Sequence, residues 1–143
     1  MISKRLKQFL EDESVSYEVI EGLEKDYAKI IMVRAGLGNA MVVMPASCEI
    51  DLGKLGVLLD VPEVTVSSDA ESAGLFPDCE AGAMPAIGRL YGLPCYIDET
   101  LLDGPSVCFK GGNHREGIRI SSYEYWRIAQ AEVGDFRLRK IAV

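Results

Sequence analysis

This sequence contains little of the side-chain chemistry on which metal sites and covalent catalysis depend. Its 143 residues include a single histidine, His114, and four cysteines, none of which form a C-x-x-C pair. Structural zinc sites draw four Cys or His ligands from such short spacings, so we expect no metal and no other cofactor. A cysteine nucleophile needs a basic partner, and one histidine gives little choice. We therefore expect reduced, structural thiols.

The chain also lacks a long apolar run. Its longest ones are strand-sized, and the polar, basic start from Met1 to Lys7 is not followed by the apolar segment of a signal peptide. We expect a soluble, cytoplasmic protein without membrane contact.

Basic residues are in the minority. Lysine and arginine number 15 against 22 acidic residues, which gives a net charge of −7. A general nucleic-acid coat protein would be basic, so we expect no DNA partner. Local RNA contact stays open, because the C-terminal part holds basic residues that either form a patch or are scattered solvated charges. These residues are Arg115, Arg119, Arg137, Arg139 and Lys140.

The length of the chain suits one domain, residues 1–143. Hydrophobic periodicity and capping residues predict an α+β (mixed α/β) fold with a mixed sheet. Ser3, Asp51 and Ser121 are expected to cap three helices, the last through a capping box with Glu124. A further short helical stretch is expected at residues 69–75. Strands are expected at residues 17–20, 29–34, 40–44, 64–67, 95–97, 107–109 and 118–120, and the second and third of these form a hairpin.

The segment FPDCEAGAMPAIG, residues 76–88, is predicted to be a loop. Small residues dominate it, so another molecule could approach its backbone closely. Successive N–H groups in such a loop can bind an anion or the oxyanion that forms when an ester is attacked. Composition alone favours the alternative interpretation, a simple turn that connects two elements.

Two further positions carry candidate chemistry. Lys29 begins the apolar strand KIIMVR, where its ammonium could bind a phosphate or polarise an ester, or simply be solvated. His114 lies in the turn GGNHRE between two strands. It could act as a general base or hold the turn by hydrogen bonding.

Several of these segments together resemble one family. The stretch FPDCEAGAMPAIGRLYGLPCYIDETLL, then VCFKGGNHREGIRISSYEYWRI, is similar to the YbaK/prolyl-tRNA-synthetase-associated editing domains. Upstream, AKIIMVR and MVVMPASCEIDLGKL match the family's strand lysine and its V-L-P-A and D-L-x-K-L segments. The ordered set extends from Lys29 to Phe136.

This resemblance implies a barrel-like mixed β-sheet with packed helices and an aminoacyl-tRNA deacylase. Such an enzyme hydrolyses the ester of a mischarged tRNA, with a small amino acid such as alanine or cysteine on proline tRNA. The implied partners are the tRNA 3′ acceptor end and a synthetase. The implied catalytic residues are Lys29, Gly82 and Ala83, and the substrate-binding residues are Met84, Pro85 and His114.

Two departures from the family pattern motivate an alternative. Ala86 stands where the G-x-x-x-P loop closes on proline, and only residues 21–28 fill a connection that is longer in other members. The alternative is a catalytically inactive member of the family that binds tRNA or another ligand. A third hypothesis is a small-molecule site that uses the Gly82 loop for an anion.

Overall fold

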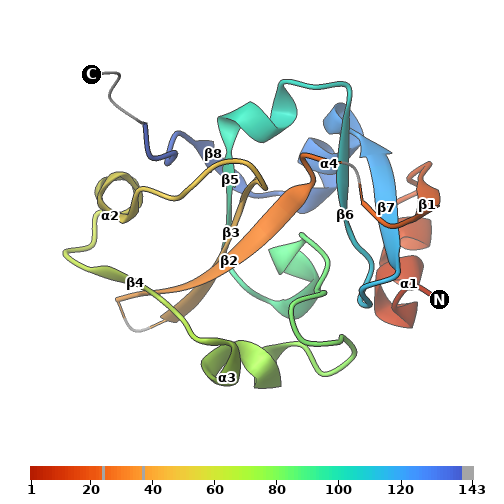
Figure 1. Cartoon of the computed structure of the whole chain (residues 1–143), viewed down its shortest axis with the longest axis horizontal. Helices are drawn as coiled ribbons and strands as arrows, with labels where there is room; N and C mark the ends of the chain where they lie inside the picture. The colour runs from red at the N-terminus through yellow and green to blue at the C-terminus, as the bar shows by residue number, and fades with distance from the viewer. Residues whose placement is uncertain (24, 37, 140–143) are drawn as a thin grey trace.

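Two β-sheets and four α-helices are present in the described part of the chain (Figure 1). The computed structural model describes residues 1–23, 25–36 and 38–139. The expected tail residue Lys140 lies outside them. The helices are α1 (Lys4–Asp12), α2 (Leu52–Leu59), α3 (Asp69–Ser72) and α4 (Ser122–Ala129), with 3-10 turns η1 (Ala73–Leu75), η2 (Gly88–Tyr91) and η3 (Glu99–Leu102). The strands are β1 (Glu18–Glu21), β2 (Ala28–Ala35), β3 (Gly38–Pro45), β4 (Val64–Val66), β5 (Cys95–Asp98), β6 (Ser106–Lys110), β7 (Glu116–Ser121) and β8 (Glu132–Gly134).

The larger sheet is mixed, as the sequence predicts. Its strand order is β4-β2-β3-β5-β8. The β2–β3 hairpin and the β2–β4 pair are antiparallel, whereas β5 runs parallel to both β3 and β8. The second sheet, β1-β7-β6, is antiparallel throughout. The mixed α/β class is thereby confirmed.

The barrel-like sheet that the family resemblance implies needs correction. The described strands pair as two separate sheets and do not close into a barrel. Strands β2 and β6 lie next to one another without forming a ladder. One edge of β2 pairs with β3 along its whole length. On the opposite edge β4 pairs only with Val33, Arg34 and Ala35, so the first half of that edge has no paired strand. An open seam between the sheets follows.

Both faces of the β2–β3 hairpin are buried, because successive strand residues point to opposite faces. Met41 and Val43 belong to the larger core, which packs between the two sheets and includes α1 and α4. Val42 and Met44 belong to a smaller core under α2. Figure 1 shows α2 on one side of β2 and β3, with β6, β7 and α1 on the other.

The three predicted helix caps are all present. Ser3 Oγ accepts the Leu6 N–H, and an Asp51 carboxylate oxygen accepts the Lys54 N–H. Ser121 Oγ accepts the Glu124 N–H at 3.1 Å. Each cap satisfies one N–H group that the first helical turn leaves without a partner.

Candidate functional site

A glycine-rich turn holds the loop that precedes η2. The Glu80 N–H donates to the Gly112 carbonyl at 2.9 Å, and the Gly112 N–H donates to the Ala83 carbonyl at 2.8 Å. Gly112 has a φ of +107°, and a Cβ at this position would lie 3.0 Å from the Ser3 Cβ. Only glycine suits that backbone. The turn after β6 therefore fixes residues 80–83 at the seam between the sheets.

His114 braces the same loop from the side. Its Nε2 lies 2.7 Å from the Ala81 carbonyl oxygen. Its Nδ1 lies 3.4 Å from Lys110 Nζ, which is also 3.4 Å from the Gly82 carbonyl oxygen. Because a carbonyl only accepts, Nε2 carries the proton and Nδ1 accepts from the lysine. The hydrogen-bonding role that the turn GGNHRE favours is thus realised geometrically.

Gly82 presents its backbone to solvent. Its φ is +77°, in the left-handed region that favours glycine. Within the described residues, its N–H has no hydrogen-bond partner. The neighbouring Ala83 is fully buried, and its N–H donates to the Glu80 carbonyl at 3.0 Å. Of the two amides for which we expected an oxyanion role, only that of Gly82 has an N–H without a partner among the described residues.

Two hollows meet at Gly82 and Met84. One, of about 160 Å³, is lined by Tyr27, Ala28, Lys29, Ile30, Gly82, Met84 and Lys110. The other, of about 130 Å³, is lined by Ser72, Ala73, Phe76, Cys79, Glu80, Ala81, Gly82 and Met84. The first hollow contains two lysines and no carboxylate among its described lining residues. In a chain of net charge −7, this is a locally positive site.

The walls of the first hollow come from both sheets. Lys29 is in β2, opposite Met44 of β3, and its ammonium makes no hydrogen bond or ion pair within the described part of the chain. Lys110 ends β6, and its ammonium lies 5.8 Å from the centroid of the Tyr27 ring. The open seam between β2 and β6 thus positions one lysine from each sheet.

A hydrogen-bonded cluster supports the second hollow. The Asp78 carboxylate accepts from Ser3 Oγ and, at 3.2 Å, from the Tyr91 hydroxyl. Cys79 Sγ lies 3.1 Å from that hydroxyl. Burial, with the neighbouring Asp78 charge, raises the pKa of the Cys79 thiol, although the Tyr91 contact opposes this shift. Cys79 is therefore a protonated thiol at neutral pH, which is a poor nucleophile.

The predicted site residues are partly brought together. Lys29, Gly82 and Met84 line one hollow, whereas His114 contacts the loop that borders it. Ala83 and Pro85 belong to the same loop, but both residues are buried. Two residues that line the first hollow, Tyr27 and Lys110, were not predicted from the sequence. Tyr27 lies in the short connection before β2, and Lys110 precedes Gly111 and Gly112; a basic residue directly before a glycine-rich turn was the only signal.

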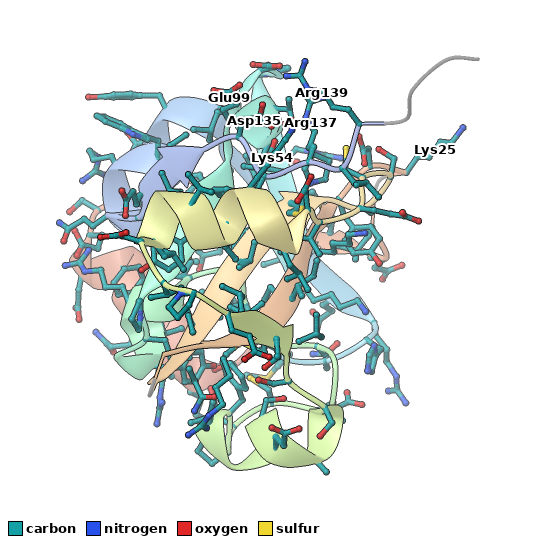
Figure 2. The ribbon with its side chains drawn as sticks, turned by 90° about the vertical axis from the view of Figure 1, so that its left-hand side faces the viewer. Lys25, Lys54, Glu99, Asp135, Arg137 and Arg139 are labelled. Atoms are coloured by element: carbon teal, nitrogen blue, oxygen red, sulfur yellow. The ribbon has the colours of Figure 1, made fainter. Side chains whose placement is uncertain are left out.

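The C-terminal arginines do not form one patch within the described residues. Arg119 is in β7 and pairs with Glu18 of β1. Arg137 follows β8 of the other sheet, close to the buried Asp98. Figure 2 shows Arg137 and Arg139 near Lys54 and Asp135, above α2. Of the two interpretations left open by the sequence, the positions of Arg119, Arg137 and Arg139 agree with scattered charges, and Lys140 lies outside the described residues.

Neither metal ligands nor a membrane span are found in the part of the chain that the structure describes. No group of three or more His, Cys, Asp or Glu side chains is arranged there to hold a metal ion. No helix there has the length and apolar character needed to cross a bilayer. Cys48, Cys79 and Cys95 form no disulfide bond with one another in the described part of the chain.

The sequence profile of the aminoacyl-tRNA editing domain matches residues 14–128. The match spans most of the chain, and this chain belongs to that family, the YbaK family that its motifs resemble. No curated protein sequence matches the chain at a significant level.

Solved structures share the whole fold. A scaffold protein used for computational epitope grafting is 24% identical over 96% of this chain and 97% of its own, with a TM-score of 0.82. A proposed trans-editing enzyme for prolyl-tRNA synthetase is 23% identical over 95% and 96%, with a TM-score of 0.80. A proposed signal transduction protein from Marinobacter aquaeolei is 17% identical over 97% of this chain but 31% of its own, with a TM-score of 0.80. The same fold thus also occurs within a much longer chain.

Proposed function

We propose that this protein is an aminoacyl-tRNA deacylase that acts at the hollow between β2 and β6. The observation that carries the proposal is the meeting of Lys29 and the unpartnered Gly82 N–H at one hollow, in a chain of the editing family. The substrate is an amino acid esterified to the terminal ribose of a tRNA. Such an ester needs positioning, a polarised carbonyl and an attacking water.

The chemistry assigned to each group follows from the charge that develops. Water adds to the ester carbonyl carbon, and the carbonyl oxygen becomes an oxyanion. The Gly82 N–H donates a hydrogen bond to that oxygen. The Lys29 ammonium stabilises the developing charge or holds the terminal ribose. The carbon–oxygen ester bond then breaks, the ribose oxygen takes up the proton that the attacking water gave up, and a free amino acid and uncharged tRNA leave.

A small misattached amino acid, such as alanine or cysteine on proline tRNA, is the proposed substrate. A synthetase discriminates one methylene by only roughly 10–200-fold, so a second hydrolytic site has a physical purpose. The hollow beside Ala81 and Gly82, at about 130 Å³, suits a small side chain. The structural relative associated with prolyl-tRNA synthetase supports this choice of tRNA. A synthetase partner and a cytoplasmic location are part of the same proposal.

The test is hydrolysis of proline tRNA charged with alanine, cysteine or serine. The purified protein is compared with Lys29→Ala and with Lys25→Ala as a matched control. Lys25 is exposed and projects away from the molecule in Figure 2. We expect turnover that Lys29→Ala abolishes and Lys25→Ala leaves unchanged. Equal activity of Lys29→Ala and the unchanged protein would remove Lys29 from the mechanism.

A binding module without catalysis is the second candidate. The observation that favours it is Ala86, where the family pattern has the proline that closes the loop. Ala86 is fully buried, and its carbonyl accepts a hydrogen bond from the Tyr125 hydroxyl. Binding of uncharged tRNA together with no turnover of any charged tRNA would favour this function. Restored turnover in Ala86→Pro would then identify the missing proline as the cause.

A further inference from the structure

Tyr27 and Lys110 form a pair that the proposed hydrolysis does not use. Tyr27 immediately precedes β2, and Lys110 is the last residue of β6. The Lys110 ammonium lies 5.8 Å from the Tyr27 ring centroid, and both residues line the Lys29 hollow. Both side chains are half-buried, so each keeps a surface that a ligand can reach. An aromatic ring beside a cation is the combination that binds single-stranded nucleic acid.

The Lys110 ammonium has hydrogen-bonding capacity to spare. It carries three N–H donors. Its contacts with the Gly82 carbonyl and His114 Nδ1 are both 3.4 Å, long for N–H···O or N–H···N bonds. It forms no ion pair with the described residues. An anion that enters the hollow can therefore bind Lys110 without displacing a carboxylate.

The floor of the hollow is an open strand edge. The Ala46 N–H donates to the Tyr27 carbonyl at 2.8 Å, which places residues 27, 29 and 31 in hydrogen-bonded pairs with β3. In an antiparallel ladder the intervening residues direct their N–H and C=O groups to the other edge. Ala28 and Ile30 are such residues, and both line the hollow. Their backbone groups face the space between the sheets. Ala28 is buried, whereas Ile30 is half-buried, so ribose hydroxyls and base edges can bond to the backbone of Ile30.

We infer that Lys110 and Tyr27 hold the last nucleotides of the single-stranded tRNA 3′ end in this hollow. Lys110 pairs with the phosphodiester that joins the final two nucleotides, and the Tyr27 ring stacks on one of their bases. The inference rests on the proposed deacylase function and adds two substrate-binding residues to it. It also explains how an acidic protein attracts RNA, because the hollow that receives the acceptor end is lined by two lysines and by no carboxylate among the described residues.

A purely structural role for Lys110 makes a different prediction. As a brace for Gly82 and His114, Lys110 would affect every ester equally. As a phosphate ligand, it affects only substrates that carry the phosphodiester. A pair of substrates separates the two roles: alanyl-tRNA, and 3′-O-alanyl-adenosine, which has the same ester and ribose but no phosphodiester.

The first experiment measures kcat/KM on both substrates for the unchanged protein, Lys110→Ala, Lys110→Arg and Lys25→Ala. We expect Lys110→Ala to lose about tenfold on alanyl-tRNA and less than about twofold on alanyl-adenosine. Lys110→Arg keeps most of the activity on tRNA, and Lys25→Ala keeps all of it. The dependence of log kcat/KM on log salt becomes shallower by about 0.7 in Lys110→Ala. Equal losses on the two substrates, or no loss on either, overturn the inference.

The stacking role of Tyr27 is tested by Tyr27→Phe and Tyr27→Ala. Removing a stacking ring costs about tenfold or more in affinity for each base. We expect Tyr27→Phe to retain the activity on alanyl-tRNA and Tyr27→Ala to lose about tenfold, mainly through KM. Identical behaviour of the two variants overturns the stacking role.

Failure of the proposed function is distinguishable from failure of this inference. If the unchanged protein hydrolyses neither substrate, binding of a fluorescent RNA oligonucleotide ending in CCA is measured by anisotropy. About tenfold weaker binding by Lys110→Ala still supports the RNA site, whereas unchanged binding overturns it. Competition by adenosine monophosphate as strong as that by the oligonucleotide assigns the hollow to free nucleotides and likewise overturns it.

Discussion

His114 Nε2 lies 2.7 Å from the carbonyl oxygen of Ala81, and this contact joins the turn after β6 to the loop that carries Gly82. The same imidazole accepts from Lys110 through Nδ1. With Nε2 against the Ala81 carbonyl and Nδ1 directed at Lys110, the imidazole is placed to orient the loop. The histidine thus contributes to the site through the position of Gly82.

Substitutions at His114 distinguish positioning from proton transfer. We expect His114→Ala to lower kcat by about tenfold. Without the imidazole, the loop that carries Gly82 shifts, and the Gly82 N–H no longer lies where the ester carbonyl binds. A glutamine side chain can also present an N–H to the Ala81 carbonyl, so we expect His114→Gln to keep most of the activity. Single-turnover deacylation measures both variants. If His114→Gln is as inactive as His114→Ala, a general-base role replaces the positioning role.

A Gly82→Ala substitution tests the backbone geometry of the loop. An L-residue in the left-handed conformation costs roughly 1–2 kcal/mol. The added Cβ would lie 3.6 Å from His114 Cε1, an ordinary contact, so strain and obstruction of the hollow are the expected effects. We expect a loss of about 1 kcal/mol in the free energy of unfolding and a much larger loss of deacylation.

Gly92→Ala is the matched control for Gly82→Ala. Gly92 has a φ of +66°, with nothing within 4 Å of an added Cβ, and lines neither hollow. We expect the same loss of stability, measured by urea unfolding, with normal activity. If Gly92→Ala loses as much deacylation activity as Gly82→Ala, the loss in Gly82→Ala is caused by lower stability and not by the changed loop.

Local signals in the sequence accounted for most of the helices. Each of the caps Ser3, Asp51 and Ser121 accepts a backbone N–H three residues further along the chain. Such a local contact can be predicted from the sequence without knowledge of the tertiary structure. The capping box at Ser121 is only half as predicted, because Glu124 pairs with Arg127. Strand β8 was missed: its three residues, Glu132–Gly134, are defined by pairing with distant residues Tyr96–Asp98.

The site was only partly predictable for the same physical reason. Lys29 and Gly82 were found because each belongs to a motif with a local pattern. Tyr27 and Lys110 belong to different sheets, and only the open seam between β2 and β6 brings them together. The engagement of the Ala83 amide likewise depends on a turn hydrogen bond to Glu80, which composition cannot specify.

Cys79 lines the second hollow, yet we expect it to be dispensable for hydrolysis. Burial raises the pKa of its thiol above the ordinary value, so the thiolate fraction at neutral pH is small. Cys79→Ser should keep deacylation within about threefold, whereas a covalent mechanism would lose activity by orders of magnitude. Steady-state kinetics of Cys79→Ser, with iodoacetamide labelling of the unchanged protein between pH 7 and 10, checks both statements. A labelling midpoint below the ordinary thiol pKa contradicts the expected protonation state.

Asp98 anchors the segment after β8. It is fully buried, and its Oδ2 accepts the Phe136 N–H at 3.0 Å. Its Oδ1 accepts from the Thr100 N–H at 3.1 Å and lies 3.7 Å from Arg137 Nε. Removing one partner of a buried charged network leaves the others unpaired, so we expect Asp98→Ala to lose about 3 kcal/mol of unfolding free energy. The exposed neighbour Glu99 is the control, and Glu99→Ala should change stability by less than about 0.5 kcal/mol in the same urea titration.

Asp78 links α1 to the loop and makes that link sensitive to acid. Partial burial opposes the shift, but hydrogen bonds from Ser3 and Tyr91 hold the pKa of the Asp78 carboxyl below its ordinary value of 3.8. A carboxyl whose pKa is lowered on folding stabilises the protein above pH 3.8, and this contribution disappears as the pH falls through the lowered value. Asp78→Asn should therefore lower the free energy of unfolding by about 1 kcal/mol at pH 7, and by progressively less below pH 4. The loss is small because Asp78 is largely exposed to solvent, which screens its charge. Urea unfolding of both proteins at pH 7 and pH 3 measures the difference. If the difference in unfolding free energy between the unchanged protein and Asp78→Asn becomes larger at pH 3, the ionised carboxylate does not stabilise the link to Ser3.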